Sequence, residues 1–246
     1  MIKLGLIGEK LSHSLSPEIH KKFMEQNNID GSYELIEIPM ENFESDFNVL
    51  KKSNYTGVNI TIPYKEKVIP LLDEISPQAK FIGAVNTVLF RNGKAIGYNT
   101  DYNGFVSTIQ HNNTKIKGKS AVILGAGGVS KAVIKGLLDE GISDITIVSR
   151  NKNNFHSLYT ISYEFFKEAN IKCDILINCT PVGMYPNVNA SPISKDLIKA
   201  EVAIDMIYNP EKTLFLKYAE ELGIKIINGS HMLYEQAIAA QKIWNS

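Results

Sequence analysis

Residues 121–130 read AVILGAGGVS, an apolar run that leads directly into a glycine-rich turn. The run has the composition of a buried strand, and the apolar spacing over 129–140 predicts a helix after the turn. Gly125 permits a tight turn, Gly127 lets the backbone approach a pyrophosphate, and the helix N-terminus offers N–H groups to an anion. The alternative is a strand-to-helix turn that binds nothing. The expected cofactor contacts in this stretch are Gly125, Ala126, Gly127, Gly128 and Val129.

The next strand ends at Ser149 and Arg150, which bear on the choice of dinucleotide. Enzymes that use NAD usually place a carboxylate at this point to bind the ribose hydroxyls, whereas residues 149–152 read SRNK. Ser149 and Arg150 can instead bind a 2′-phosphate, through charge-assisted contacts on the order of 1.5–3 kcal/mol each. The sequence therefore favours NADP, unless Arg150 is only a solvated side chain.

Short apolar runs alternate with helical patterns on both sides of this stretch, which is the rhythm of α/β proteins. Among the expected elements are a helix over 65–72 and a hairpin that turns at Asn92-Gly93. We expect two domains with an active-site cleft between them: a mostly parallel α/β substrate domain and a doubly wound, Rossmann-like NADP-binding domain. The polar residues 111–115 are the best linker candidate.

Composition excludes several other classes of protein. The chain has 246 residues with 26 basic and 26 acidic side chains, so no overall charge attracts nucleic acid. No apolar run approaches the roughly 18 residues of a membrane span, and no signal peptide is recognisable. Cys173 and Cys179 have no paired framework and no ligand-spaced histidines. We therefore expect a soluble, cytoplasmic protein without a metal site.

Several polar motifs outside the glycine-rich turn have no explanation in secondary structure. They read HSLSP at 13–17, NITIPYK at 59–65, GAVNT at 83–87, GYNTD at 97–101, NCTPVGM at 178–184, DMIYNP at 205–210 and GSHMLYEQA at 229–237. In order and spacing they resemble the signatures of shikimate dehydrogenases, over nearly the whole chain. The resemblance implies domains at 1–101 plus 229–246 for the substrate and at 102–228 for NADP.

The resemblance also implies a reaction, the NADP-dependent reduction of 3-dehydroshikimate to shikimate in aromatic amino acid (chorismate) biosynthesis. It makes Lys65 and Asp101 the catalytic pair beside the reacting oxygen, although a lone lysine is usually a solvated charge. The alternatives are a shikimate/quinate dehydrogenase that uses NAD, and a non-catalytic dinucleotide-binding homologue. The chain is expected to be a monomer or a homodimer.

The remaining roles come from the same resemblance. The substrate-binding residues would be Ser14, Ser16, Asn59, Thr61, Asn86, Thr100, Tyr208 and Gln236. Ser16 followed by Pro17 also predicts a helix start, with Ser16 as N-cap, where the helix dipole favours a substrate carboxylate. Further cofactor contacts would be Thr180, Met184, Met206 and Gly229, although core packing explains the methionines equally well.

Other reactive residue types receive structural interpretations. Cys179 has no histidine placed to form its thiolate, so we interpret it as a small buried hydrophobe. We interpret His13, His20 and His231 as structural. The sequence departs from the family at Glu9–Leu11 and again at 151–170, and the second departure leaves the adenine pocket and any contact by Lys152 open.

Overall fold

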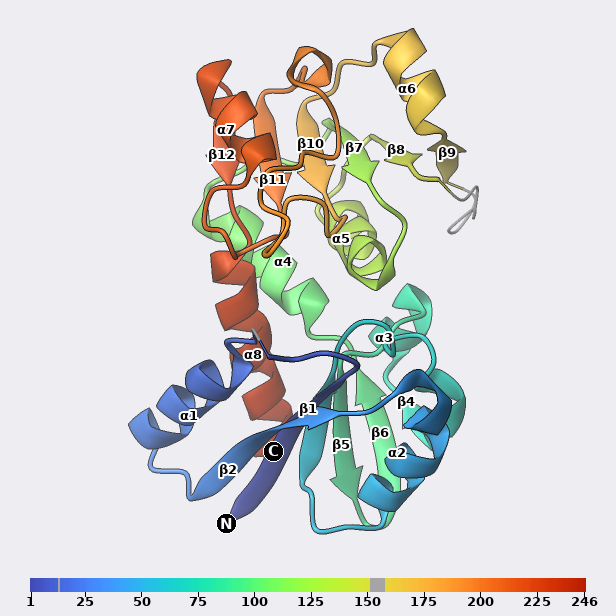
Figure 1. The fold of residues 1–246 in the computed structure, drawn as a ribbon, viewed down its shortest axis with the longest axis vertical. Coiled ribbons are helices and arrows are strands. Elements are labelled where there is room, and N and C mark those ends of the chain that lie inside the picture. Colours follow the sequence, from blue (N-terminus) through green and yellow to red (C-terminus); the bar gives the residue numbers. More distant parts are fainter. Residues whose placement is uncertain (13, 151–157) are drawn as a thin grey trace. The chain divides into compact units, whose positions relative to one another are not determined.

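The computed structural model describes residues 1–12, 14–150 and 158–246, which form two units (Figure 1). Unit 1 comprises residues 1–103 and 234–246, and unit 2 comprises residues 104–233. The structural role expected of His13 and the possible contact by Lys152 lie outside the described residues. Each unit contains one sheet with helices on both faces.

The elements of unit 1 are β1 (Ile2–Gly8), α1 (Ser16–Gln26), β2 (Gly31–Glu37), η1 (Met40–Asn42), α2 (Phe43–Lys51), β3 (Gly57–Ile60), η2 (Ile69–Leu71), β4 (Glu74–Ile75), α3 (Pro77–Ile82), β5 (Thr87–Arg91) and β6 (Lys94–Tyr98). Within the described chain the strand order is β2-β1-β3-β5-β6-β4. Strand β1 pairs parallel with β2 and β3, β4 pairs parallel with β6, and only β5 runs antiparallel to its neighbours. The mostly parallel sheet is therefore confirmed.

The hairpin between β5 and β6 turns where the sequence predicted it. Asn92 and Gly93 have φ values of 53° and 74°, and a two-residue loop of this kind matches the twist of the strands it joins. One face of the sheet packs on α2 and α3 through Phe43, Phe47 and Ala79. The other face packs on α1 and the C-terminal helix through Met24 and Trp244 (Figure 1).

Two local expectations for unit 1 were wrong. Residues 65–72 form turns and the short 3-10 helix η2 rather than an α-helix, because Pro70 lacks an N–H and its ring disfavours continued helix. The N-cap of α1 is Leu15 rather than Ser16. Ser14 lies one residue before the N-cap, and its Oγ accepts the backbone N–H of Ser16 at 3.2 Å.

The elements of unit 2 are β7 (Ser120–Leu124), α5 (Gly128–Asp139), β8 (Asp144–Val148), β9 (Tyr159–Ile161), α6 (Tyr163–Ala169), β10 (Ile175–Asn178), η3 (Lys195–Leu197), β11 (Val202–Asp205), α7 (Leu214–Glu221) and β12 (Lys225–Ile227). All of the described strand pairs of this sheet are parallel, in the order β12-β11-β10-β7-β8-β9. Read from β9, this is the doubly wound order of dinucleotide-binding folds, with its reversal between β7 and β10. The Rossmann-like fold is confirmed.

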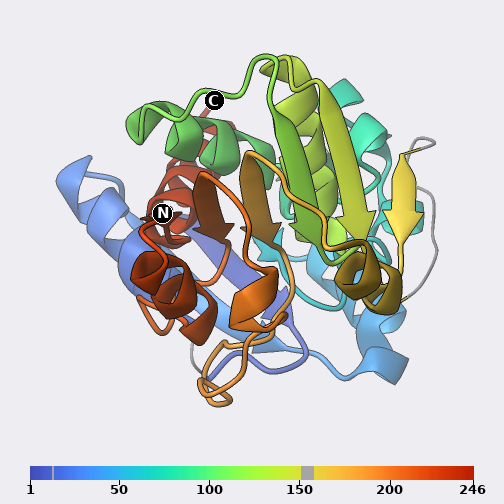
Figure 2. The same cartoon turned by 90° about the horizontal axis from the view of Figure 1, so that it is seen from above.

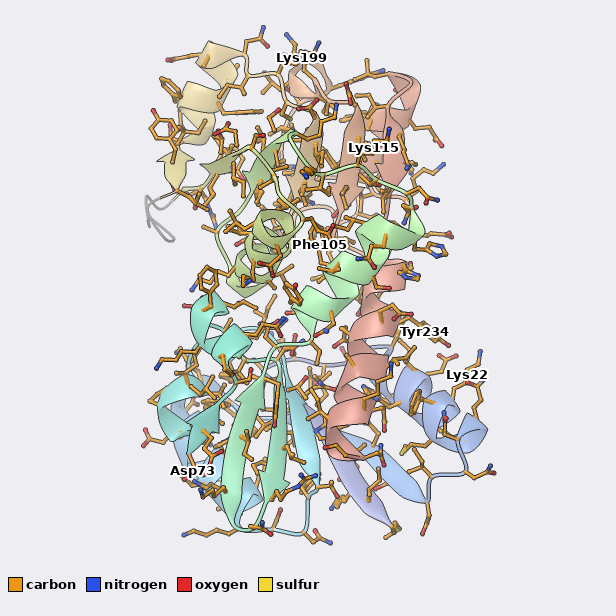
Figure 3. The ribbon with its side chains drawn as sticks, turned by 180° about the vertical axis from the view of Figure 1, so that it is seen from behind. Lys22, Asp73, Phe105, Lys115, Lys199 and Tyr234 are labelled. Carbon is orange, nitrogen blue, oxygen red and sulfur yellow. The ribbon has the colours of Figure 1, made fainter. Side chains whose placement is uncertain are left out.

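Two longer helices contribute residues to both units. Helix α4 (Asp101–His111) begins in unit 1 and α8 (Ser230–Trp244) ends there. The remainder of α4 packs with α5 on one face of the unit 2 sheet, while α6 and α7 pack on the other (Figure 2). Phe105 of α4, labelled in Figure 3, lies so close to α5 that a Cβ on Gly136 would meet its ring at 2.7 Å.

The linker expected at residues 111–115 was wrong because of this same packing. Phe105, Ile109 and Ile116 are all buried in one apolar cluster with strands of unit 2, so the polar turn between the last two lies inside this unit. A polar, aperiodic stretch marks a surface loop, and only packing tells whether that loop separates domains. No helix of the described chain is long and apolar enough to cross a membrane.

Candidate functional site

Lys65 and Asp101, 36 positions apart in sequence, form an ion pair in unit 1. The Lys65 Nζ lies 2.5 Å from Asp101 Oδ2, and the two side chains are only 12% and 8% exposed. Asp101 is the first residue of α4, and Lys65 lies in the turn after β3, where its carbonyl accepts the Val85 N–H at 2.8 Å. Both partners are thus anchored by backbone, which places a cation and an anion together with little contact with water.

Asn86 connects this pair to Thr100. Its Nδ2 donates to Asp101 Oδ1 at 2.9 Å, so each carboxylate oxygen of Asp101 has a donor. Its Oδ1 accepts the Thr100 backbone N–H at 2.7 Å and the Thr100 hydroxyl at 3.2 Å. Three residues predicted from two different motifs, Asp101, Asn86 and Thr100, therefore share one buried hydrogen-bond network.

The network continues through Thr87 to Asn59 and from there to Tyr33, and the sequence analysis singled out neither Thr87 nor Tyr33. Asn59 Oδ1 accepts from the Tyr33 hydroxyl at 2.8 Å, and Asn59 Nδ2 donates to Thr87 Oγ1 at 3.0 Å. Burial raises the pKa of Tyr33, so its hydroxyl keeps its proton. Thr87 follows Asn86 within a motif and could have been noticed, whereas Tyr33 lies in an ordinary strand pattern that gives no signal.

His20 packs beside Tyr33 in contacts that suit the expected structural role. Its ring stacks on Tyr33 with centroids 4.2 Å apart, and Gln241 Nε2 lies 2.9 Å from its Nδ1. Burial lowers the pKa of His20 to about 3, so the ring is neutral at physiological pH. His231 in unit 2 also has structural contacts, since it stacks on His111 at 4.2 Å and lies 3.1 Å from the Ser107 hydroxyl.

The other predicted substrate contacts are less buried than this network. All four of those in unit 1 are half-buried: Ser14, Ser16, Thr61 and Gln236. Tyr208 lies in unit 2 after β11, and burial raises its pKa. Their substrate contacts stay predictions.

The glycine-rich turn of unit 2 has the geometry that an anion needs. Gly125 has a φ of 99°, and a Cβ there would meet Thr180 Cγ2 at 2.9 Å. Gly127 is the N-cap of α5, and a Cβ on it would meet no atom within 4 Å. Ser130 is buried, and its hydroxyl donates to the Gly127 carbonyl at 2.6 Å. The space in front of α5 is therefore open to a ligand, and the turn fits a dinucleotide pyrophosphate.

The residues after β8 fit a 2′-phosphate. Ser149 is nearly buried and its N–H donates to the Ile161 carbonyl at 3.0 Å, which fixes the end of the strand. Arg150 follows it and is exposed. An exposed guanidinium beside a fixed strand end can form a bidentate pair of hydrogen bonds with a phosphate.

A second buried network shapes the turns that follow β10 and β11. Asn178 Nδ2 donates to Asp205 Oδ1 at 3.0 Å, and Asn178 Oδ1 accepts both the N–H and the hydroxyl of Thr180 at 2.9 and 2.7 Å. Asp205 also accepts from the Ile207 N–H and the Thr213 hydroxyl. Burial raises the pKa of Asp205 to about 6. The sequence analysis missed this carboxylate, although it opens one of the quoted motifs.

The remaining predicted cofactor contacts differ in how far packing explains them. Met184 is 41% exposed, so core packing does not account for it, whereas Met206 packs against a core cluster. Gly229 has a packing reason, because a Cβ there would meet the Met206 carbonyl oxygen at 2.3 Å. Burial raises the pKa of Cys179, which packs against the same cluster, and this agrees with the interpretation of Cys179 as a small hydrophobe.

Comparison with known proteins finds a matching family model for each of the two units. The family model described as shikimate dehydrogenase substrate binding domain matches residues 6–88, and the model described as shikimate / quinate 5-dehydrogenase matches residues 107–182. A curated shikimate dehydrogenase (NADP(+)) from Clostridium perfringens strain 13 is 46% identical over 98% of this chain and 91% of that protein. The chain belongs to the shikimate dehydrogenase family. This confirms the resemblance.

Solved structures of the shikimate dehydrogenase family agree with this fold. Shikimate dehydrogenase 1 from Peptoclostridium difficile has a TM-score of 0.93 at 47% identity, covering 100% of this chain and 92% of that one. The enzyme from Thermus thermophilus, crystallised with NADP(H) and shikimate, has a TM-score of 0.88 at 33% identity, covering 99% and 93%.

The two turn glycines of this family member give a matched pair of substitutions. We predict that Gly127→Ala raises the KM for NADP at least about tenfold by filling the open space, while costing at most about 1 kcal/mol of stability. Gly125→Ala should instead lower the melting temperature, because its φ of 99° and the Thr180 contact both oppose a Cβ. Steady-state kinetics and thermal melts measure the two effects. An unchanged KM in Gly127→Ala would contradict the pyrophosphate assignment.

The raised pKa of Asp205 predicts a pH-dependent stability. Its folded-state pKa of about 6 exceeds the ordinary 3.8, so the stability from binding its proton is complete below the ordinary value and is lost as the pH rises through 6. We therefore compare the unfolding free energies of the natural protein and of Asp205→Asn. The value for the natural protein minus that for the variant should decrease as the pH rises from 3.8 to about 6, by about 1.4 kcal/mol per unit of pKa shift. Urea titrations at several pH values measure the difference. A constant difference would show that burial does not raise this pKa.

Proposed function

We propose that this chain catalyses the reversible, NADP-dependent reduction of 3-dehydroshikimate to shikimate, a step of aromatic amino acid biosynthesis toward chorismate. The observation that carries the proposal is the shielded Lys65–Asp101 pair, which is hydrogen-bonded to the Asn86 amide, a group that can bind hydroxyl groups. The NADP-named relatives and the NADP(H)–shikimate complex of the Thermus enzyme support it. When bound, NADP⁺ would accept a hydride from the alcohol carbon, and NADPH would donate a hydride to the ketone carbon in the reverse direction.

Lys65 is the proton carrier in this proposal. Oxidation of the alcohol releases a proton from oxygen, and reduction of the ketone requires one there, so a positioned donor and acceptor contributes about 10²–10⁴-fold. The ammonium of Lys65 has three N–H groups, and Asp101 accepts one. The others can approach a substrate oxygen. Asp101 would orient the amine and stabilise its charge.

The surrounding polar groups bind the rest of the substrate. Asn59, Asn86 and Thr100 would contact the ring hydroxyls, helped by Thr61 and Gln236. Ser14 and Ser16 stand at the start of α1, where backbone N–H groups and the helix dipole favour the substrate carboxylate. Tyr208 is proposed as a further residue that binds the substrate.

The cofactor residues belong to the second part of the proposal. The turn 125–129 would hold the pyrophosphate, Ser149 and Arg150 the 2′-phosphate, and Thr180, Met184, Met206 and Gly229 the nicotinamide end. The proposed division assigns residues 1–101 and 229–246 to the substrate and 102–228 to NADP. We also propose a cytoplasmic enzyme, monomeric or homodimeric, in keeping with two free cysteines.

A reduced-nicotinamide absorbance assay tests the function. Purified protein should reduce NADP⁺ with shikimate, and should do so faster than with quinate or with NAD⁺. A preference for quinate with NAD⁺ would replace the proposal with the NAD-dependent alternative. No turnover with any pair, despite cofactor binding, would identify a non-catalytic homologue.

We predict that Lys65→Ala lowers turnover by at least about 10²-fold and leaves the affinity for NADP unchanged. Lys51 offers a matched control, because its Nζ pairs with Asp73 at 2.7 Å in the same unit and belongs to none of the proposed contacts. Lys51→Ala should keep its turnover. Shikimate oxidation rates and NADP binding titrations measure both variants. Near-normal turnover in Lys65→Ala would remove this residue from the mechanism.

Arg150→Ala tests the cofactor choice. The variant should raise the KM for NADP by about tenfold or more and change the KM for NAD little, since only NADP has the 2′-phosphate. Lys172→Ala provides a comparison, because Lys172 is also an exposed cation of unit 2 but lies outside the proposed cofactor contacts. Equal effects of Arg150→Ala on both cofactors would place the phosphate contact elsewhere.

A further inference from the structure

Thr87 occupies the centre of the buried network in unit 1, although neither the sequence analysis nor the proposed chemistry gives it a role. It is the first residue of β5 and is fully buried. Its Oγ1 lies 3.0 Å from Asn59 Nδ2, 3.0 Å from Asn86 Oδ1 and 3.2 Å from Thr100 Oγ1. One hydroxyl thus touches three side chains that the proposed function assigns to the substrate.

Backbone groups at two points determine which way the hydrogen bonds run. Asn59 Nδ2 faces the Asn86 carbonyl at 3.1 Å, and a carbonyl can only accept. Asn59 Oδ1 therefore faces the Tyr33 hydroxyl, which must donate to it. Asn86 Oδ1 faces the Thr100 N–H at 2.7 Å, and an N–H can only donate, so Asn86 Nδ2 is the group that faces Asp101.

Thr87 joins these two fixed amides. Because Asn59 Nδ2 donates to its oxygen, the Thr87 proton is available to Asn86 Oδ1. The bonds then run in one direction, from the Tyr33 hydroxyl through Asn59, Thr87 and Asn86 to the carboxylate of Asp101. Bonds aligned in this way polarise one another, and the last N–H supports the ionised Asp101 beside Lys65.

We propose that Thr87 is a positioning residue, whose hydroxyl links the amides of Asn59 and Asn86 in the orientations that the backbone groups set and so continues the chain of hydrogen bonds to Asp101. Both N–H groups of Asn59 are then occupied within the protein, so Asn59 meets a substrate hydroxyl as an acceptor through Oδ1. Asn86 Oδ1 already receives donors from Thr87 and Thr100, so Asn86 meets a substrate hydroxyl as a donor through its second N–H. This inference rests on the proposed function and specifies which amide accepts a hydrogen bond from a substrate hydroxyl and which amide donates one.

Thr87→Val tests the proposal because it preserves shape and removes only the hydroxyl. We expect kcat/KM for shikimate to fall at least about tenfold, because Asn59 Nδ2 and Asn86 Oδ1 each lose a buried partner. The acidic side of its pH profile should move toward higher pH, and the KM for NADP should change less than about twofold. Thr87→Ser, which retains the hydroxyl, should restore kcat/KM to within about threefold of the natural protein and restore the pH profile.

Thr108→Val is the matched control. Thr108 is also fully buried, and its hydroxyl donates to the Gly104 carbonyl within α4 at 2.7 Å. The variant should lower the melting temperature without moving the pH profile, which separates loss of stability from loss of positioning. If Thr87→Val does not fold, Thr87→Ala takes its place with the same expected shift.

Three outcomes would overturn the role of Thr87 while leaving the proposed function intact. In the first, the natural protein is active and Thr87→Val keeps its kcat/KM. In the second, the pH profile of Thr87→Val matches that of Thr108→Val. In the third, Thr87→Ser is as impaired as Thr87→Val. Failure of the natural protein to oxidise shikimate would instead overturn the proposed function.

Discussion

The ammonium of Lys65 and the carboxylate of Asp101 are both largely removed from water, and the buried polar network of unit 1 supplies the hydrogen bonds that this pair requires. Removing two charges from water costs several kcal/mol per ion, and their attraction offsets this only when further hydrogen bonds satisfy them. Asp101 meets the condition, because Lys65 bonds one of its oxygens and Asn86 the other. Lys65 is held in place by its own carbonyl, which accepts the Val85 N–H. An ion pair this well fixed is available for chemistry without first being assembled.

The two buried networks differ in what stabilises the carboxylate at their centre. In unit 1 the chain from Tyr33 to Asp101 consists of neutral groups that end on a paired carboxylate. In unit 2 the carboxylate of Asp205 accepts from an amide, a hydroxyl and a backbone N–H, all of which are neutral groups. Its desolvation is therefore only partly offset, and its pKa rises to about 6. The gain is local order, because Asn178 and Asp205 together fix the turns that follow β10 and β11.

Sequence patterns predicted the parts of the fold that depend on neighbouring residues. The strand and glycine-rich turn at 121–130 and the Asn92-Gly93 hairpin follow from local composition and backbone preference, and both are confirmed. The helix expected over 65–72 and the linker at 111–115 were wrong, because Pro70 and the packing of Ile109 and Ile116 override the local pattern. Local signals identify elements more reliably than they identify how those elements pack.

The candidate site was predictable only in part, for a related reason. Lys65 and Asp101 were paired through a family resemblance, since a separation of 36 positions hides their proximity from any local pattern. Tyr33, Thr87 and Asp205 were missed because their importance comes from hydrogen bonds across the sheet or between turns. A tyrosine in a strand looks like ordinary sheet composition until its hydroxyl is seen to donate to Asn59.

The two units also recognise their proposed ligands with different kinds of groups, and this has a consequence for specificity. Unit 2 has open space beside the backbone of Gly127, and in the proposed function its choice between dinucleotides would depend on Ser149 and the exposed guanidinium of Arg150. Such contacts discriminate by about tenfold to a hundredfold. Unit 1 presents buried amides of fixed polarity, and a site of that kind can reject a ligand that leaves them unpaired by about 10⁴–10⁵-fold. Cofactor preference should therefore change with few substitutions, whereas the proposed choice of ring hydroxyls would depend on the buried framework of β3, β5 and α4.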